Sequence, residues 1–475
     1  MARRTLLSLD DALLDRVVAQ LVETEGLKTA IANTCLINKH FAALLKRPLA
    51  AWATLDLVWE KDGRLSRQGM SVLAYWLEVV APGVRRLRLI TPWPSLEIAP
   101  FLLRAKALQE LEVPGTRLLP PHLAILGLLT SLKSLHCECD LPGGLQPLSS
   151  LASLRQLRRL GLTVVNGPLE GLLPPSLSAL TGLELQLMAR SSPSHHADYH
   201  PHLRLPWAWC QAASQVTTAV LESVDLPLLE DYTAGTAAIL PAMRHLQLLS
   251  PMAPLADTAL GHCLALESLK IDGGAFASAD WEVLSPLTRL RSLTLLQCER
   301  VEEEEEEEEE EEPMRSESLS SLTCLTSLEI CGGPIPDAFT FLPVLRSLVL
   351  NEVVDDDMDP GAWCLWRGPW LHKLESLRVY GGEVGEIREA LRQATRLSSL
   401  ELEGCVWLCF SREELPLLLR LPLRHLLLDK RSGVAGSDRP RKLWNKESLW
   451  VANELNKELE MRGPGGWFTI CTDDR

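Results

Sequence analysis

Residues 266–298 read LESLKIDGGAFASADWEVLSPLTRLRSLTLLQC, and the same six-residue segment occurs in them twice, as Leu266–Ile271 and as Leu290–Leu295. Each segment has apolar residues at its first, fourth and sixth places. Side chains alternate between the two faces of a strand, so the fourth and sixth residues point the same way. A strand this short cannot bury an apolar face alone, and we expect it to have a copy of itself alongside.

The segment recurs along most of the chain. By first residue, the matches are Val84, Leu108, Leu132, Leu157, Leu180, Val216, Met243, Leu266, Leu290, Leu325, Leu345, Leu374, Leu397 and Leu423. Most steps between matches are 23 to 27 residues, and the three longest steps contain inserts at 189–206, 301–316 and 351–370. Fourteen matches at a near-constant step predict stacked units in which each repeat packs against its neighbours.

This repeat resembles the leucine-rich repeat family, whose period is roughly 20–29 residues. The resemblance implies an α/β solenoid with parallel strands on its concave face and helices, 3₁₀ turns or extended chain on its convex face. The chain departs from the family at the ninth place of the repeat, where asparagine is usual. That place holds Asp140, Gly274, Cys298, Gly333, Gly382 or Cys405.

The composition bounds the class of partner. The 475 residues carry a formal charge of −15, of which the run Glu302–Glu312 supplies 11 negative charges, leaving −4 without it. This balance argues against a nucleic-acid partner. No apolar run approaches the ~18 residues of a membrane span, and the start of the chain has no signal-peptide core, so we expect no membrane contact and no secretion.

The cysteines indicate a reducing compartment. The 12 cysteines are scattered without a CxxC pair, the closest being Cys137 and Cys139, and Cys137 falls at an inward repeat position. A thiol there behaves as a small hydrophobe. We therefore expect a cytoplasmic or nuclear protein without disulfides.

The N-terminal segment is helical rather than repetitive. An apolar stripe with spacings of three and four residues predicts a first helix, and further helical pieces follow until Pro48. Trp52 to Leu57 then reads as a degenerate first strand, and the residues before the first clear repeat predict a helix with one apolar face formed by Leu73, Trp76, Leu77 and Val80.

This segment resembles an F-box. The residues on the family's positions are Leu9, Leu13, Leu14, Val17, Val18 and Leu21, then Cys35, Phe41, Leu44, Pro48 and Trp52. Asp10 and Ala12 depart from the family's proline and glutamate, and the spacing from Cys35 to Phe41 is slightly long. The resemblance implies that these residues from Leu9 to Leu21, together with Cys35 and Phe41, bind the adaptor subunit of an SCF-type (cullin–RING) ubiquitin ligase. The alternative is that these helices only cap the solenoid, whose end repeat would otherwise expose its apolar face.

The inserts offer weaker signals. His195, His196, His200 and His202 lie in the first insert, but without paired cysteines or a helical frame they predict solvated loop residues rather than a metal site. The run of glutamates is either a neutral expansion or an attractor for a basic partner. In the third insert, Trp363 and Trp366 follow a group of aspartates and either bind a basic peptide or fold onto the solenoid.

No catalytic or cofactor-binding motif is present in the sequence, so we expect a non-catalytic protein without a metal or cofactor. The alternation instead predicts a mixed-charge concave face suited to a substrate protein. Its candidate residues, with the two tryptophans of the third insert, are Arg86, Arg88, Glu110, Glu112, His136, Arg378 and Tyr380.

Together these observations predict four parts. They are an F-box-like helical domain at 5–50, a linker with a degenerate repeat at 51–83, a solenoid of about 14 repeats at 84–430 and a C-terminal cap at 431–475. The layout favours a substrate-recognition subunit of an SCF-type E3 ubiquitin ligase that promotes degradation of its target. The alternative is a leucine-rich-repeat scaffold that works without a ligase.

Overall fold

The computed structural model describes residues 53–58, 67–90, 97–140, 146–165, 177, 179–188, 203–205, 207–229, 239–251, 253–276, 280–300, 318–331, 342–351, 368–380, 391–403, 415–429, 450, 453–455, 457–458, 461 and 467–471. The predicted F-box-like helices at 5–50 lie outside these ranges. The chain divides into two compact units, residues 1–224 and 225–475, and each is described by itself.

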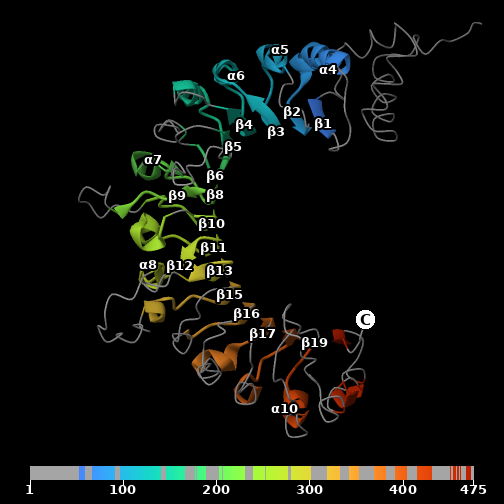
Figure 1. Ribbon diagram of the computed structural model, residues 1–475, viewed down its shortest axis with the longest axis vertical. Helices are drawn as coiled ribbons and strands as arrows, with labels where there is room; N and C mark the ends of the chain where they lie inside the picture. The colour runs from blue at the N-terminus through green and yellow to red at the C-terminus, as the bar shows by residue number, and fades with distance from the viewer. Residues whose placement is uncertain are drawn as a thin grey trace, which may run out of the picture. The chain divides into compact units, whose positions relative to one another are not determined.

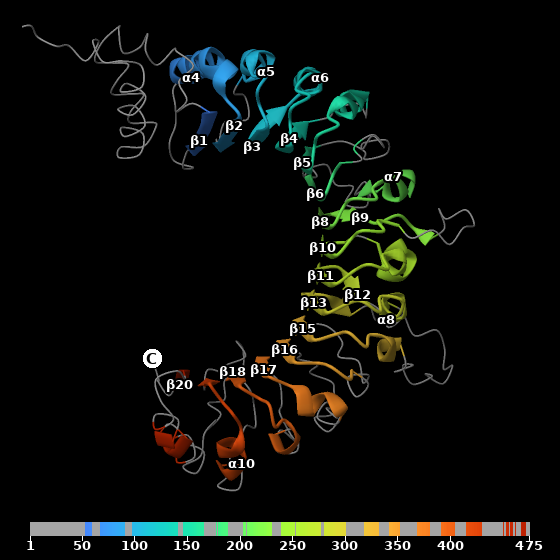
Figure 2. The ribbon, with the colours of Figure 1, turned by 180° about the vertical axis from the view of Figure 1, so that it is seen from behind.

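The first unit is a parallel sheet with helices along one side (Figures 1 and 2). Its strands, each hydrogen-bonded to the next, are β1 (Thr54–Val58), β2 (Arg86–Ile90), β3 (Glu110–Leu118), β4 (Ser134–Asp140), β5 (Arg159–Val165), β6 (Gly182–Met188) and β8 (Thr218–Glu222). The segments that return between them contain α4 (Arg67–Val80), η3 (Ala81–Gly83), α5 (Ala99–Arg104), α6 (Pro120–Leu126), η4 (Gln146–Ser153), β7 (Leu203–Arg204) and α7 (Trp207–Ala212). The two-residue β9 (Val224–Asp225) follows β8.

The second unit repeats the same plan. Its strands in order are β10 (His245–Leu249), β11 (Ser268–Asp272), β13 (Ser292–Leu296), β15 (Ser327–Cys331), β16 (Ser347–Asn351), β17 (Ser376–Tyr380), β18 (Ser399–Glu403), β19 (His425–Asp429) and β20 (Trp467–Cys471). The shorter elements between them are η6 (Leu255–Asp257), η7 (Ala259–His262), β12 (Ala275–Phe276), α8 (Asp280–Leu284), β14 (Glu299–Arg300), η8 (Ser318–Ser321), η11 (Pro369–Lys373) and α10 (Leu415–Arg420). None of the described helices is long and apolar enough to cross a bilayer.

The core of each unit is made by the repeat positions. All fourteen residues that open the repeats are buried, as are the described side chains at the fourth and sixth places. The pairing is parallel and in register, so Leu269, Leu293 and Leu328 of consecutive strands stack directly upon one another. The predicted α/β solenoid of leucine-rich-repeat type, with parallel strands, is confirmed.

The predictions for the start of the sheet also hold. Strand β1 pairs with β2 in parallel, and β20 pairs with β19. The predicted helix before the first clear repeat is α4, whose apolar stripe of Leu73, Trp76, Leu77 and Val80 is buried. Trp209, at the close of the first insert, is buried as well.

A left-handed residue follows each of three consecutive strands of the second unit. Ser250, Gly273 and Gln297 have φ of 49°, 79° and 50°. Each donates its backbone N–H to the last residue of the next strand: to the carbonyl oxygens of Asp272 at 2.6 Å, Leu296 at 2.7 Å and Cys331 at 2.6 Å. Main-chain bonds thus tie each strand end to the next repeat, one residue before the place where the sequence lacks the usual asparagine.

Glycine is required at one of these turns. Gly273 and Gly274 have φ of 79° and 85°, and a Cβ built on Gly274 would lie 2.8 Å from Cγ of Pro251. Side chains other than glycine are strained in this region of backbone space, and the proline ring cannot move away freely.

We expect Gly274→Ala to lower the free energy of unfolding by about 1–3 kcal/mol, because it combines a left-handed backbone with a close contact. Gln297→Gly is the matched control: it removes left-handed strain, and we expect a change within about 0.5 kcal/mol. Urea unfolding followed by tryptophan fluorescence measures both. Equal losses in the two variants would contradict this account of the turn.

Several thiols belong to the core. Cys137, Cys139 and Cys263 are fully buried, and the Sγ atoms of Cys137 and Cys139 lie 3.7 Å apart. The hydrogen bond to Cys139, followed by burial, raises the pKa of Cys137 well above its ordinary value, and burial raises the pKa of Cys263 to about 12. The prediction that Cys137 is an inward apolar residue is confirmed.

At pH 8 Cys137 and Cys263 stay protonated, because their pKa values lie above the solution pH, and a thiol reacts with alkylating agents only as thiolate. We expect iodoacetamide to label the exposed Cys324 in the native protein and to spare Cys137 and Cys263 until denaturant is added. Peptide mass spectrometry reports the order. Labelling of Cys263 at the rate of Cys324 would show that the core opens freely.

Candidate functional site

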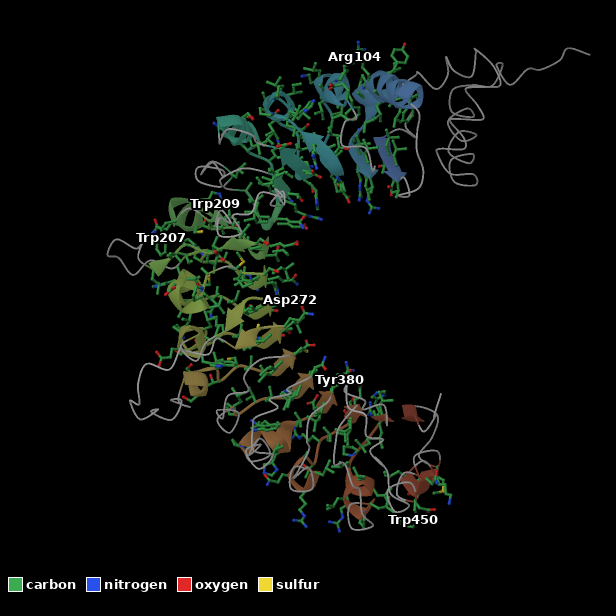
Figure 3. The ribbon with its side chains drawn as sticks, in the orientation of Figure 1. Arg104, Trp207, Trp209, Asp272, Tyr380 and Trp450 are labelled. Atoms are coloured by element: carbon green, nitrogen blue, oxygen red, sulfur yellow. The ribbon has the colours of Figure 1, made fainter. Side chains whose placement is uncertain are left out.

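The face of each sheet opposite its helices, here called the open face, carries the polar side chains. Strand positions alternate between buried and half-exposed, so every second residue projects from this face. Figure 3 shows the side chains of Asp272 and Tyr380 on the side of the second unit's strands away from its helices. The predicted residues Arg86, Arg88, Glu110, Glu112 and His136 lie on the open face of the first unit.

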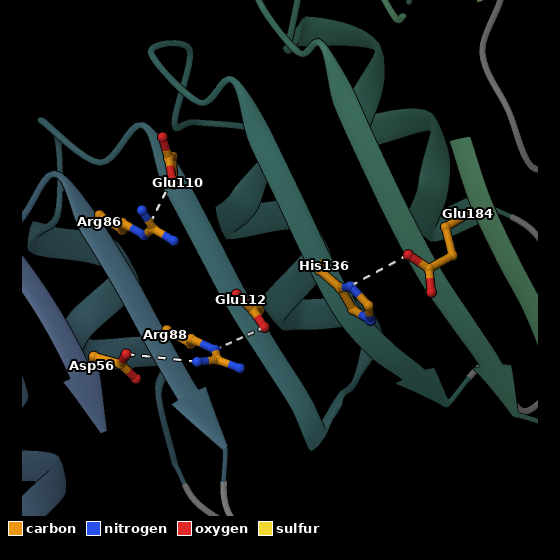
Figure 4. A network of polar contacts seen from close by, with 7 residues as sticks. All are labelled: Asp56, Arg86, Arg88, Glu110, Glu112, His136 and Glu184. Atoms are coloured by element: carbon orange, nitrogen blue, oxygen red, sulfur yellow. Dashed lines mark hydrogen bonds and ion pairs between the residues drawn. The ribbon is translucent and has the colours of Figure 1, made fainter. Parts of the chain in front are cut away.

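Arg88 stands between two carboxylates. The register aligns it with Asp56 on β1 and with Glu112 on β3. Its Nε lies 3.0 Å from Oε1 of Glu112, and its Nη1 lies 3.6 Å from Oδ2 of Asp56 (Figure 4). The hydrogen bond and negative charge of Glu112 are the main causes that raise the pKa of Arg88. One row nearer the strand starts, Arg86 and Glu110 form a second pair at 3.3 Å.

His136 reaches across a whole strand. Its Nδ1 lies 3.8 Å from Oε2 of Glu184, although β5 separates β4 from β6 (Figure 4). The residue between them is Gly161, and a Cβ on that glycine would lie 3.0 Å from the imidazole. The missing side chain leaves room for the ring to lie over β5. Glycine inside a strand often marks such a close approach, and this was the available signal in the sequence.

Strand β3 contains a site residue that the alternation missed. The register shifts between Val113 and Arg117, with Gly115 at φ 80°, and this irregularity aligns Arg117 with Glu138 of β4. Arg117 Nε then lies 2.7 Å from Glu138 Oε1. Alternation along β3 cannot assign Arg117 to the open face, because the irregularity interrupts the period of two residues. Pro114 and Gly115 were the sequence signal that the alternation stops there.

The second unit has its own charged group. Glu401 occupies an open-face position of β18 but is nearly buried, with its side chain 8% exposed. Its Oε1 accepts a hydrogen bond from Arg378 Nη2 at 2.7 Å, and Nε2 of His425 lies 2.9 Å from the same oxygen. Arg378 Nε lies 2.5 Å from Oε2. Neighbours on two strands cover this carboxylate, so it orients Arg378 rather than meeting solvent.

The predicted site residues therefore fall into separate groups. Arg86, Arg88, Glu110, Glu112 and His136 share one face of the first unit, whereas Arg378 and Tyr380 belong to the second. Trp363 and Trp366 lie outside the described residues, as do the predicted adaptor-binding residues Leu9, Leu13, Leu14, Val17, Val18, Leu21, Cys35 and Phe41. Trp370, the third tryptophan of that insert, is fully buried and cannot form an exposed binding site.

The described faces present charged and polar side chains. Within the described ranges, no group of three or more His, Cys, Asp or Glu side chains is arranged to hold a metal ion. Most of the charges already have a partner of opposite sign on a neighbouring strand. Such a face can offer shape, hydrogen bonds and paired charges to another molecule.

The strand register and one-sided helices decide the fold type. The chain has the leucine-rich-repeat fold. A comparison with protein-family models finds no match, and neither does a comparison with curated proteins.

Among solved structures, a leucine-rich-repeat protein of Leptospira interrogans is similar with a TM-score of 0.45 and 16% identity over 82% of this chain and 81% of that chain. An internalin of Listeria monocytogenes has a TM-score of 0.42 and 15% identity over 76% and 87%. A TDR receptor has a TM-score of 0.43 and 16% identity over 82% and 62%. At sequence identities this low, the similarity is one of fold alone.

We expect Arg378→Ala to lower the free energy of unfolding by roughly 1–3 kcal/mol, because it leaves the nearly buried Glu401 with less hydrogen bonding. Arg346→Ala is the matched control. Its pair with Glu375, at 3.4 Å, is solvent-exposed, and we expect a loss of at most about 1 kcal/mol. Chemical denaturation compares the two, and equal losses would mean that the burial of Glu401 has no energetic consequence.

Proposed function

We propose that this chain is a non-catalytic substrate-recognition subunit of an SCF-type E3 ubiquitin ligase. In this proposal the repeats bind a target protein and the N-terminal segment binds the adaptor of the cullin–RING assembly. The observation that carries the recognition part is the open face of the first unit, where Arg88 and its neighbours are held in fixed positions by ion pairs across the strands.

A recognition surface benefits from such preorganisation. Side chains that are ordered before binding lose less conformational entropy when a partner arrives. The paired charges around Arg88, Glu112 and His136 also suit a protein surface of mixed sign better than a uniformly charged polymer. Both considerations support protein binding over binding of a polyanion at the open face.

The ligase part rests on the sequence. The apolar pattern from Leu9 to Leu21 and the later match from Cys35 to Trp52 resemble an F-box, and repeats of the same kind often follow an F-box. The adaptor would bind the apolar side of these helices. The cytoplasm or the nucleus, where such ligases act, agrees with the scattered cysteines.

The mechanism is proximity. The subunit forms and breaks no bond itself, and it needs no cofactor. It holds the target near the charged ubiquitin-conjugating enzyme, which replaces a bimolecular encounter by one at a high effective concentration.

The second candidate function is a ligase-independent scaffold. In that case the N-terminal segment only caps the apolar end of the solenoid and has no apolar side left for an adaptor.

The two functions are separated by Leu13→Asp with Val17→Asp in the full-length chain. If the ligase assignment is right, these charges abolish co-purification of the cullin and adaptor subunits, because they fall on the apolar stripe. Arg16→Asp with Ala19→Asp, on the side of the same predicted helix away from the apolar stripe, is the control and keeps both subunits.

A third variant tests the open face. Arg86→Glu with Arg88→Glu should release the target protein while the adaptor stays bound. Wild-type chain that purifies without cullin or adaptor subunits but with other partners would support the scaffold and exclude the ligase.

A further inference from the structure

The start of the strands in the first unit is strongly basic in a protein that is acidic as a whole. Six cationic side chains lie at or just before the first residues of β2, β4 and β5 and in the turn before β3, and all six are exposed. This basic edge consists of Arg85, Lys106, Lys133, Arg155, Arg158 and Arg159. Between Asp140 and Glu170 the chain carries three of these arginines and no acidic residue.

Backbone hydrogen bonds place the members of the basic edge in adjacent rows. Gln109 donates its N–H to the Arg85 carbonyl at 2.7 Å, Lys133 to the Gln109 carbonyl at 2.7 Å, and Arg158 to the Lys133 carbonyl at 2.7 Å. Each step crosses one strand, so the basic edge extends over roughly 14 Å from β2 to β5. Arg159 begins β5 beside Arg158, and Lys106 and Arg155 each stand two residues before the opening leucine of their repeat.

The cations of the basic edge are largely uncompensated. Among the described residues, the side chains of Arg85, Arg155, Arg158 and Arg159 form no hydrogen bond or ion pair. Lys133 donates a hydrogen bond to a neutral group, Oε1 of Gln109, at 3.1 Å. Clustered like charges repel one another, so this arrangement is unfavourable until an anionic partner joins it.

The repeat itself does not require this arrangement. In the second unit the same row contains two glutamates that pair with arginines of neighbouring strands: Arg244 pairs with Glu267 at 3.5 Å, and Arg346 pairs with Glu375 at 3.4 Å. In the first unit the row from β2 to β8 contains no acidic residue, so its cations have no partner of opposite sign within the row. The difference between the units indicates a role for the charge beyond folding.

We infer that the basic edge binds an acidic segment of a partner protein, such as a run of glutamate or aspartate. An extended segment of about five residues spans the ~14 Å from β2 to β5, at ~3.3 Å per residue. The arginine side chains offer forked donors that fit carboxylates. This inference builds on the proposed protein-binding function and names the chemistry of a partner at the strand starts, where the basic edge borders the open face.

A nucleic acid fits the basic edge less well. Single strands bind through stacked bases as well as phosphates, which requires aromatic side chains. Residues 104–112, 127–137 and 150–161, which form the basic edge and its surroundings, contain no Phe, Tyr or Trp. The net charge of −15 also repels a long polyanion at distances beyond this small surface.

The test uses purified full-length protein and a fluorescein-labelled peptide of glutamates as the probe, with anisotropy measured at low and at physiological salt. We expect binding that weakens as salt increases, and little binding of a neutral peptide of alternating glutamate and lysine. Arg155→Ala with Arg158→Ala and Arg159→Ala should weaken binding roughly tenfold, since three charge contacts are lost. All three residues are exposed, so the fold is retained.

The matched control removes three exposed arginines of the second unit: Arg289→Ala with Arg291→Ala and Arg396→Ala. It changes the net charge equally, and we expect a loss of less than about twofold. Equal weakening by both triple variants, or no binding by the wild type, would overturn the inference. A single-stranded oligonucleotide of equal charge that binds more tightly than the peptide would overturn the choice of a protein partner. The assay contains no adaptor, so its failure leaves the ligase proposal standing.

Discussion

The parallel, in-register pairing of strands is the constraint on which the rest of the structure depends. Because consecutive strands align residue by residue, as Leu269 does with Leu293 and Leu328, one short apolar pattern builds a continuous core. The same register puts equivalent surface positions one strand apart. Residues of opposite charge at those positions are then close enough to form ion pairs across the strands, as they do around Arg88.

This constraint explains how much of the molecule could be predicted from the sequence. The strands, their parallel order and the buried repeat positions follow from a spacing of two within a strand and a near-constant step between strands. The candidate residues Arg86, Arg88, Glu110 and Glu112 follow from the same alternation, because it assigns a face to each position. The ion pairs follow only once the register is known.

The remaining contacts of the site could not be predicted, because they depend on local departures from the strand alternation or on residues of neighbouring strands. Arg117 could not be placed because an irregularity shifts the count within β3, and the reach of His136 depends on the missing side chain of Gly161. The burial of Glu401 arises from Arg378 and His425 on the flanking strands, which no single strand reveals. Spacing assigns a face to a residue, whereas exposure on that face depends on its neighbours.

The irregularity in β3 divides the open face of the first unit into two regions of different geometry. Toward the strand starts, every strand from β1 to β4 contributes one residue per row, so a molecule lying across them meets an evenly spaced lattice. Beyond Val113 the third strand contributes three extra residues, and the lattice is interrupted. A ligand with a regular repeat, such as an extended backbone crossing several strands, can therefore match the spacing of these residues only on the half of the face nearest the strand starts.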